Sequence, residues 1–437
     1  MMRSLPAGGR SARWRRRGVQ ALFGWLAVGA LLVACGSAPG RSAGSTPSAG
    51  AASCVANVPA VVGRAEKRAS TRSPLPGALA SKLNAAARSS FKNAAAPGAI
   101  VGVRTPEGTW TQTYGVADPT TGAPMTTDMH VRIGSVTKTF TGTLVLQLAQ
   151  QGRLSLSDPI SKYVAGIPNG DRITIAMLAD MTSGIASYYT KPFLEKYFGD
   201  PSTIFTPQQL VAYGVAASPI FSPGAKFDYS NTNTILLGEV IEKVTGEPVA
   251  QVLQQQILTP LGLSNTSFPD TSPAIPAPHP QGYTLQGSEN PQHPTDATSW
   301  SPSFGWTAGG MISTLADMLT YDRALGTGQG LLSSATQTKR LDSFPRPAGY
   351  GLAIGCIDGW VGHTGELPGF NSSVYYDTAS DTSVVVLVNS DISSGKCSES
   401  PTLTDNPDEL PCSAPATRVF VGLSQALGHP FHPNPAK

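Results

Sequence analysis

The chain has 437 residues, 40% of them hydrophobic, which is enough for a large buried core and for more than one average domain. Its formal charge of +3 arises in the first 35 residues, which contain six arginines and no acidic residue. Without those six arginines, 25 of the 31 basic residues remain against 28 acidic residues, so the rest of the chain has a net charge of −3. That balance argues against nucleic acid as a partner.

The N-terminal segment resembles a bacterial export signal. A basic stretch ends at Arg17, and the apolar run from Ala21 to Ala34 is too short for a comfortable membrane span. The run ends in Leu32-Val33-Ala34-Cys35, which resembles the lipobox of bacterial lipoproteins. We therefore expect a lipoprotein signal peptide over residues 1–35, exported by the Sec or the twin-arginine route. Lipidated Cys35 would then hold the protein at the outer face of the cell membrane; an uncleaved anchor helix is the alternative.

The next segment, residues 36–75, consists mostly of Ser, Ala, Gly and Pro. Such a composition has too few large apolar side chains to bury a core, so it predicts a flexible tether. We expect one folded domain over residues 76–430 and a short tail over residues 431–437.

Four cysteines follow the lipobox: Cys54, Cys356, Cys397 and Cys412. An exported chain favours disulfides, and four cysteines allow three connectivities. The last three are close in sequence, which favours a bond from Cys356 to Cys397 or Cys412. No CxxC or HExxH spacing occurs and the six histidines are scattered, so we expect neither a metal nor another cofactor.

The predicted secondary structure falls into three parts. A helix and a two-stranded hairpin come first, helical segments and a Pro-rich loop fill the middle, and strands followed by a helix come last. In chain order we expect a helix over 79–93, strands over 99–104 and 110–117, a helix from 135 to 152, helices from 206 and over 232–244, a loop over 269–302, strands over 350–357, 370–377 and 383–389, and a helix over 415–427.

This order predicts an α+β fold. The early strands are expected to join the late ones in one antiparallel sheet, flanked by the N- and C-terminal helices, with the largely helical middle as a second lobe. Small-molecule sites form preferentially in the cleft between two such parts.

The first chemical signal is Ser135-Val136-Thr137-Lys138 at the start of a helix. Residues at i and i+3 share a helix face, so the Lys138 amine can reach the Ser135 hydroxyl. A serine is a weak nucleophile until a neighbouring base takes its proton, and a lysine can do so only if its pKa falls from about 10.4.

Two other segments match this Ser-x-x-Lys spacing, so position decides between them. Ser89 to Lys92 lies inside a polar helix and Ser393 to Lys396 in a Gly-Ser loop, whereas Ser135 opens an apolar helix that must be buried. A helix N-terminus also favours negative charge developing on the hydroxyl.

Two further signals accompany it. Tyr229-Ser230-Asn231 offers a phenol that could relay protons, if Lys138 acidifies it, and an amide that could hold a substrate amide and orient Lys138. His363-Thr364-Gly365, followed by Glu366, predicts a small-residue strand edge along which a substrate can lie and whose backbone N–H can face an oxyanion. Taken alone, each is also typical of an ordinary turn or strand.

Together and in this order, the three signals resemble the serine β-lactamase and penicillin-binding group, especially its class C, D-alanyl-D-alanine carboxypeptidase-like and esterase-like branch. Residues 178–184 and 304–310 resemble it as well, and the resemblance covers about 77–430. It implies that Ser135 is acylated, that Lys138 and Tyr229 share acid–base duty, and that Asn231, His363, Thr364 and Gly365 line the substrate site. It also implies an oxyanion hole made by the backbone N–H groups of Ser135 and Glu366.

The chain departs from that group in its charges. Between Arg346 and Lys396 it has no Lys or Arg to bind a substrate carboxylate, and Glu366 would repel an anion if it faced the cleft. These features favour an uncharged ester or amide, although a cell-wall-derived peptide stays possible. A Ser-Asp-Asn motif is absent, which argues against a class A β-lactamase.

Two other classes of protein remain. An α/β-hydrolase needs Gly-x-Ser-x-Gly at a strand-to-helix turn, and the match at Gly40 to Gly44 lies in the predicted tether. A binding lipoprotein with weak or no turnover would keep the fold, but the complete set of Ser135, Lys138 and Tyr229 favours an enzyme.

Overall fold

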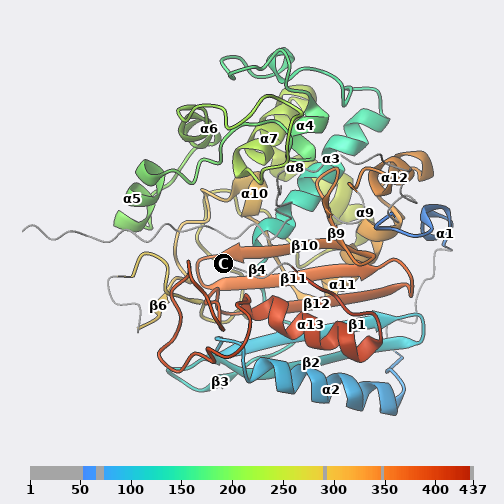
Figure 1. Ribbon diagram of the computed structural model, residues 1–437, viewed down its shortest axis with the longest axis vertical. Helices are drawn as coiled ribbons and strands as arrows, with labels where there is room; N and C mark the ends of the chain where they lie inside the picture. Colours follow the sequence, from blue (N-terminus) through green and yellow to red (C-terminus); the bar gives the residue numbers. More distant parts are fainter. Residues whose placement is uncertain (1–52, 65–72, 289–292, 346–348, 434–437) are drawn as a thin grey trace, which may run out of the picture.

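The computed structural model describes residues 53–64, 73–288, 293–345 and 349–433. Its centre is an eight-stranded antiparallel sheet with the order β3-β2-β1-β12-β11-β10-β9-β8 (Figure 1). The sheet strands are β1 Gly98–Thr105, β2 Gly108–Asp118, β3 Ala123–Pro124, β8 Gly349–Tyr350, β9 Gly355–Ile357, β10 Trp360–Leu367, β11 Phe370–Asp377 and β12 Thr382–Val388. Two small hairpins pair β4 Val131–Arg132 with β7 Ile312–Ser313, and β5 Tyr283–Thr284 with β6 Thr295–Asp296.

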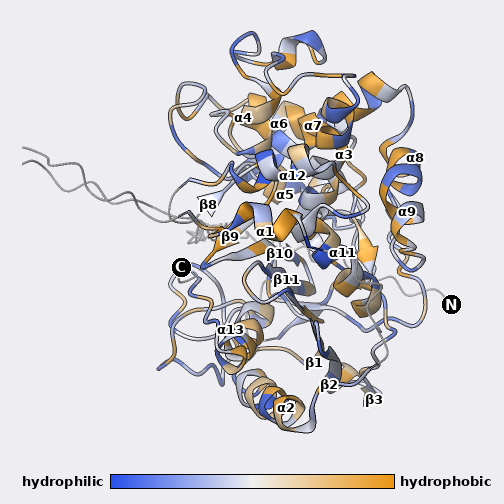
Figure 2. Ribbon diagram, turned by 90° about the vertical axis from the view of Figure 1, so that its right-hand side faces the viewer, coloured by the Kyte–Doolittle hydropathy of each residue, from blue (hydrophilic) through white to orange (hydrophobic). Residues whose placement is uncertain are grey.

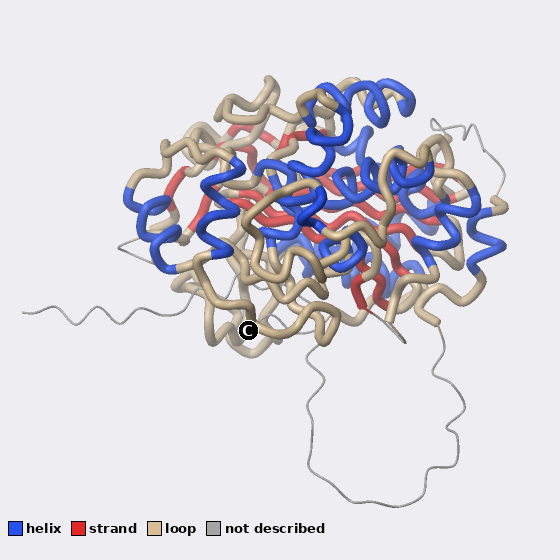
Figure 3. Tube along the Cα trace, turned by 90° about the horizontal axis from the view of Figure 1, so that it is seen from above, coloured by secondary structure: helices blue, strands red, loops and turns tan. Residues whose placement is uncertain are grey.

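Helices cover both faces of this sheet. In chain order they are α1 Val58–Val62, α2 Gly77–Phe91, α3 Thr137–Gln150, α4 Ile175–Ala179, α5 Lys191–Gly199, α6 Pro207–Val215, α7 Asn231–Thr245, α8 Val249–Leu253, α9 Thr259–Leu261, α10 Trp306–Gly309, α11 Leu315–Thr327, α12 Ser334–Leu341 and α13 Pro415–Leu427, with short irregular turns at Gly134–Val136 (η1), Ile160–Lys162 (η2) and Gln254–Leu258 (η3). The terminal helices α2 and α13 lie side by side on one face, and α3 to α8 gather on the other side (Figures 1 and 2). Seen from above, helices and long loops enclose the strands (Figure 3). The predicted α+β class is confirmed.

Strand alternation divides the core between these two faces. Along β12, Val384, Val386 and Val388 pack with α2 and α13, whereas Val385 and Leu387 join the larger core on the opposite face. Successive side chains of a strand point to opposite faces, so a run of valines with both faces covered becomes a fully buried central strand. The sheet therefore provides a rigid surface on which the helical lobe packs.

Most of the predicted elements are confirmed. The helices at 79–93, 135–152, 206, 232–244 and 415–427, the early hairpin and the strands β11 and β12 lie within a few residues of their expected bounds. The strand expected over 350–357 is two short strands instead, because Gly351 N donates to Ile354 O and Ala353 adopts a left-handed φ of 56°, which turns the chain. The Pro-rich loop contains the small β5–β6 hairpin.

Part of the predicted tether is wrong. Residues 53–64 contain α1 and bury Val55, Val58 and Val61, and Cys54 bonds covalently to the sheet. Leu75 is buried as well. Composition missed this because the three valines are buried against the core of the folded domain, which the composition of the segment does not reveal. The tether prediction for 36–52, the signal peptide and Cys35 lie outside the described residues.

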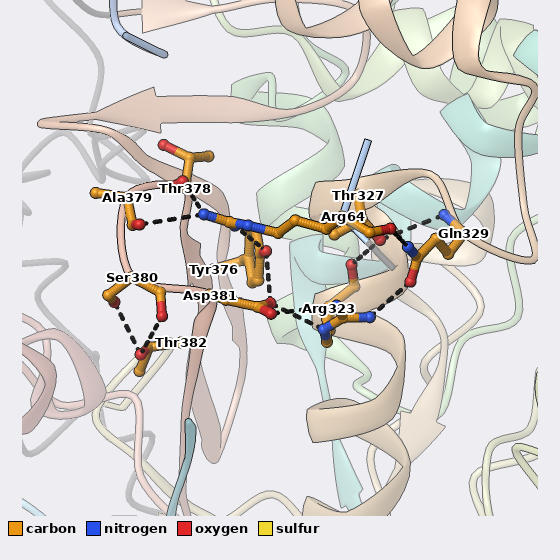
Figure 4. A network of polar contacts seen from close by, with 10 residues as sticks. All are labelled: Arg64, Arg323, Thr327, Gln329, Tyr376, Thr378, Ala379, Ser380, Asp381 and Thr382. Carbon is orange, nitrogen blue, oxygen red and sulfur yellow. Dashed lines mark hydrogen bonds and ion pairs between the residues drawn. The ribbon is translucent and has the colours of Figure 1, made fainter. Parts of the chain in front are cut away.

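An arginine at the end of this segment fastens it to the sheet. Arg64 donates to the Tyr376 hydroxyl and, at 2.6 Å, to the carbonyl oxygen of Thr378 (Figure 4). Tyr376 in turn donates to Asp381 at 2.8 Å, and Asp381 forms an ion pair with Arg323 of α11, also at 2.8 Å. The network links the N-terminal segment to β11, to the turn between β11 and β12, and to α11.

The disulfides differ from the expected pairing. Cys54 bonds to Cys356 on β9, and Cys397 bonds to Cys412. The bond favoured from Cys356 to Cys397 or Cys412 is wrong, since Cys356 lies in the sheet beside the N-terminal segment while the other two close a loop of their own. Of the helices in the described residues, none is long and apolar enough to cross a membrane.

Candidate active site

Ser135 lies in the η1 turn that leads into α3, with part of its side chain exposed. The flanking Ile133 and Val136 are fully buried, and α3 is buried along nearly its whole length. Apolar anchoring on both sides fixes the serine on a rigid element while leaving its hydroxyl accessible.

Lys138 follows in the first turn of α3 and is 0% exposed. Its Nζ lies 2.9 Å from Ser135 Oγ and donates to the carbonyl oxygen of Ala308 at 2.7 Å. Burial lowers the pKa of Lys138 well below its usual value, and among the described residues no carboxylate forms an ion pair with it. A neutral amine in this position donates one N–H to Ala308 and keeps its lone pair for the Ser135 proton.

Tyr229 stands on the other side of the pair, with its ring centroid 5.0 Å from Lys138 Nζ. Burial and the neighbouring Tyr350 ring raise the pKa of Tyr229 well above its usual value, and a hydrogen bond with Ser135 opposes that shift. The phenol is therefore protonated at neutral pH. The pKa of Tyr229 is thus shifted upward, opposite to the acidification by Lys138 that the sequence suggested.

Two glycines bring β10 against the serine turn. A Cβ on Gly365 would lie 1.9 Å from Ile133 O, and a Cβ on Gly134 (φ +52°) would lie 2.3 Å from the backbone nitrogen of Glu366. Only glycine fits at either position, so the sequence itself places the backbone of Glu366 beside Ser135.

Side chains of β11 hold this backbone in orientation. Asn371 Nδ2 donates to Gly365 O at 3.0 Å, and Ser372 Oγ donates to Ile133 O at 2.9 Å. The two ends of a trans peptide point in opposite directions, so anchoring Gly365 O towards β11 turns the Glu366 N–H towards the serine side. On its other edge β10 pairs with β9 at residues 360–362, and in the described part of the chain no strand pairs with that edge from His363 onward.

The remaining predicted site residues occupy different environments. His363 is buried against the rings of Tyr229 and Tyr350, at centroid distances of 6.0 and 5.5 Å. Burial, with the nearby Lys138 as the smaller cause, lowers the pKa of His363 to about 3, so the imidazole is neutral at physiological pH. Thr364 contacts Tyr375. Asn231 begins α7, and within the described part of the chain its amide forms no hydrogen bond to Lys138.

Sequence reasoning missed three parts of this site. The Ala308 carbonyl is the second hydrogen-bond partner of Lys138, but every residue has a backbone oxygen, so a sequence motif cannot identify this one. Tyr350 packs edge-on against Tyr229 and His363. Asp391 joins Glu366 through a shared hydrogen-bond partner, Gln286, and nothing in the sequence connects these three residues. Among the described residues no three His, Cys, Asp or Glu side chains come together to hold a metal ion.

A serine beside a buried lysine with a lowered pKa is an arrangement suited to nucleophilic catalysis by the serine. Residues 83–401 match the Beta-lactamase family, and the chain belongs to that family. The predicted resemblance is thereby confirmed at the level of the family.

Individual proteins that are similar to the chain in sequence or structure are consistent with this family. The chain is 28% identical over 259 residues to a putative penicillin-binding protein, PbpX, of Bacillus subtilis, covering 59% of this chain and 61% of that one. It thus spans about three fifths of the length of this curated relative. A D-stereospecific amidohydrolase from Streptomyces sp. is 34% identical with a TM-score of 0.65, over 73% of this chain and 95% of that one. D-amino acid amidase from Ochrobactrum anthropi, solved with L-phenylalanine, is 25% identical with a TM-score of 0.62, over 71% and 91%.

Proposed function

We propose that the protein hydrolyses small amides or esters through a covalent acyl-Ser135 intermediate. The observation that carries the proposal is the 2.9 Å separation between Ser135 Oγ and the Nζ of the fully buried Lys138. Burial favours the neutral amine, which is the form that can accept a proton at neutral pH.

The geometry supports a two-step reaction. Lys138 takes the Ser135 proton as Oγ attacks the substrate carbonyl, and the resulting oxyanion faces the backbone N–H groups of Ser135 and Glu366. The carbonyl re-forms and the leaving amine or alkoxide departs with a proton from Tyr229, which Lys138 can replace. Water then attacks the acyl ester with Lys138 as base, releasing the acid and free Ser135.

The substrate class follows from the charges around the site. The pocket beside Glu366 is lined by aromatic side chains and contains no lysine or arginine. A carboxylate next to the scissile bond would find no partner there, whereas the neutral amide or ester of an amino acid or short peptide would meet no charge penalty. The likeness to a D-stereospecific amidohydrolase supports an amide of this kind.

We further propose that the enzyme works at the outer face of a bacterial membrane, tethered through lipidated Cys35. The supporting feature is the order of basic stretch, short apolar run and lipobox-like Leu32-Val33-Ala34-Cys35. Metabolic labelling with an alkyne-tagged palmitate tests it. Labelling that disappears in Cys35→Ser is expected, and equal labelling of both forms would contradict lipidation at this residue.

Covalent trapping tests the catalytic proposal. The protein is treated separately with a fluorophosphonate and a fluorescent penicillin, and the modified peptide is mapped by mass spectrometry. The fluorophosphonate adduct is expected on Ser135, to be lost in Ser135→Ala and kept in Ser393→Ala, which alters another Ser-x-x-Lys match. No Ser135 adduct with either reagent would leave a binding lipoprotein with the same fold.

A further inference from the structure

A pocket with aromatic walls lies beside the oxyanion hole. Its walls come from α5 and the residue Tyr189 before it, from Phe304, and from the end of β10 with the residue that follows: Tyr189, Phe193, Leu194, Tyr197, Phe198, Phe304, Leu367 and Pro368. Glu366 and Gln286 are its polar lining. Because the backbone nitrogen of Glu366 abuts Gly134, the pocket begins where the acyl group of a substrate on Ser135 would emerge.

A second carboxyl group stands behind the first. Gln286 Nε2 donates to Asp391 Oδ2 at 2.5 Å and to Glu366 Oε1 at 3.3 Å, so one amide bridges both acids. Asp391 is only 6% exposed and also accepts from Thr284 Oγ1 at 2.9 Å and Gly369 N at 3.2 Å. Every one of these partners is neutral.

The two acids have no positive charge to balance them. Among the described residues, neither Glu366 nor Asp391 forms an ion pair with a lysine, arginine or histidine. Burying a carboxylate without a counter-charge is costly, and a structure that keeps two in one place leaves room for a cation from outside. Aromatic faces add to this, since their quadrupoles attract ammonium groups.

We propose that the pocket is a subsite for a protonated amine, and that Glu366, supported by Asp391 behind it, supplies the negative charge that holds the amine. This inference rests on the proposed acyl-Ser135 chemistry and names its substrate: an amide or ester whose acyl part carries a free ammonium group and an apolar side chain. A neutral N-acyl group would leave the carboxyl pair without its partner.

The titration of the pair supports this assignment. Burial raises the pKa of Glu366 and so does the neighbouring Asp391, and burial also raises the pKa of Asp391. The other titratable groups near them are Tyr189, which senses the Glu366 charge, and Tyr197, which senses that of Asp391; burial raises the pKa of both phenols, so both stay neutral. The carboxyl pair thus keeps a proton at pH values where free carboxyls are ionised.

A bound ammonium would favour the fully ionised pair, so its binding releases the retained proton. Affinity for the amine substrate then rises as the pH rises through the raised pKa range of the pair. It falls again when the substrate amine itself loses its proton, at about 7.7–8.0 for an α-amino group.

Matched substrates test the proposal: the D- and L-phenylalanine p-nitroanilides with a free amine, and their N-acetyl forms. We expect the free amines to have a kcat/KM at least about tenfold higher, through KM. Glu366→Gln keeps the backbone N–H and should erase most of this ratio. Asp391→Asn should lower it and move the KM inflection to lower pH, since it removes the charge that raises the pKa of Glu366. Glu195→Gln, which removes an exposed charge from α5, is the control and should keep the ratio.

Equal kcat/KM for amine and N-acetyl forms, or a ratio unchanged in Glu366→Gln, would overturn the subsite. If no nitroanilide is turned over, ester hydrolysis is measured with 2-phenylethylamine and 2-phenylethanol as inhibitors. Stronger inhibition by the amine, lost in Glu366→Gln, supports the subsite, and equal inhibition overturns it. Failure of the proposed function looks different: no substrate is turned over and fluorophosphonate leaves Ser135 unmodified, in which case the inference falls with it.

Discussion

Gly365 and Ile133 touch so closely that a Cβ on the glycine would lie 1.9 Å from the isoleucine carbonyl oxygen. The contact joins β10 to the turn that carries Ser135, and it sets the spacing of the backbone N–H groups of Ser135 and Glu366 that we propose as the oxyanion hole. Gly365→Ala must push the strand and the turn apart. We expect a loss of about 10²–10³ in kcat, measured with an activated ester, because misplacing one oxyanion donor has that effect.

A glycine elsewhere provides the control for this substitution. Gly199 ends α5, and a Cβ there would meet nothing within 4 Å. Gly199→Ala should therefore leave kcat unchanged. A Gly365→Ala enzyme with full activity would show that the close contact does not set the oxyanion hole.

The buried Lys138 predicts a pH dependence of stability. Its pKa is lowered in the folded protein, so the unfolded chain binds more protons between that lowered pKa and about 10.4. The contribution of this residue to the free energy of unfolding must therefore rise with pH across that window. Lys138→Met has no titrating amine at this position. In urea unfolding, the free energy of unfolding of the wild type should therefore increase relative to that of the variant from pH 7 to pH 10. A constant difference would mean that the lysine is charged in the folded state.

The loss of activity at low pH should not arise from protonation of His363. With a pKa of about 3, it stays neutral from pH 5 upward, so the rise of kcat/KM with pH should follow the deprotonation of Lys138. His363→Asn should lower the rate but keep the same inflection in a pH profile of ester hydrolysis. An inflection that disappears with His363 would assign the limb to the imidazole.

The disulfide between Cys54 and Cys356 links the N-terminal segment to strand β9 of the sheet. It joins residues 302 positions apart, whereas Cys397 and Cys412 are separated by 15. Longer loops lose more entropy on cross-linking, so the Cys54→Ser/Cys356→Ser double variant should lose about 2–5 kcal/mol in the free energy of unfolding. The Cys397→Ser/Cys412→Ser variant, measured in the same urea titration, should lose less. The reverse order would contradict an anchoring role for residues 53–64.

Local sequence patterns predicted the helices and strands well, but they did not predict the contacts between them. The valine-rich β12 and the capped helix α6 follow from periodicity and from Thr206-Pro207, since these signals act within a few residues. The disulfide pairing, the α1 segment and the bridge from Gln286 to Asp391 depend on residues that meet only in the folded chain. For the same reason a pattern placed Ser135 and Lys138 on one helix face, but only the fold shows that Lys138 donates to Ala308 O and that burial lowers the pKa of its amine.

The most direct test of the account is the mass of the intact protein during turnover of an activated ester. A species heavier by the acyl group should form on Ser135 within a single turnover, and Lys138→Ala should slow its formation by about 10²–10⁴ without loss of the far-ultraviolet circular dichroism of the fold. Acylation of Lys138→Ala at the wild-type rate, or an adduct on a residue other than Ser135, would contradict a mechanism in which this buried lysine activates this serine.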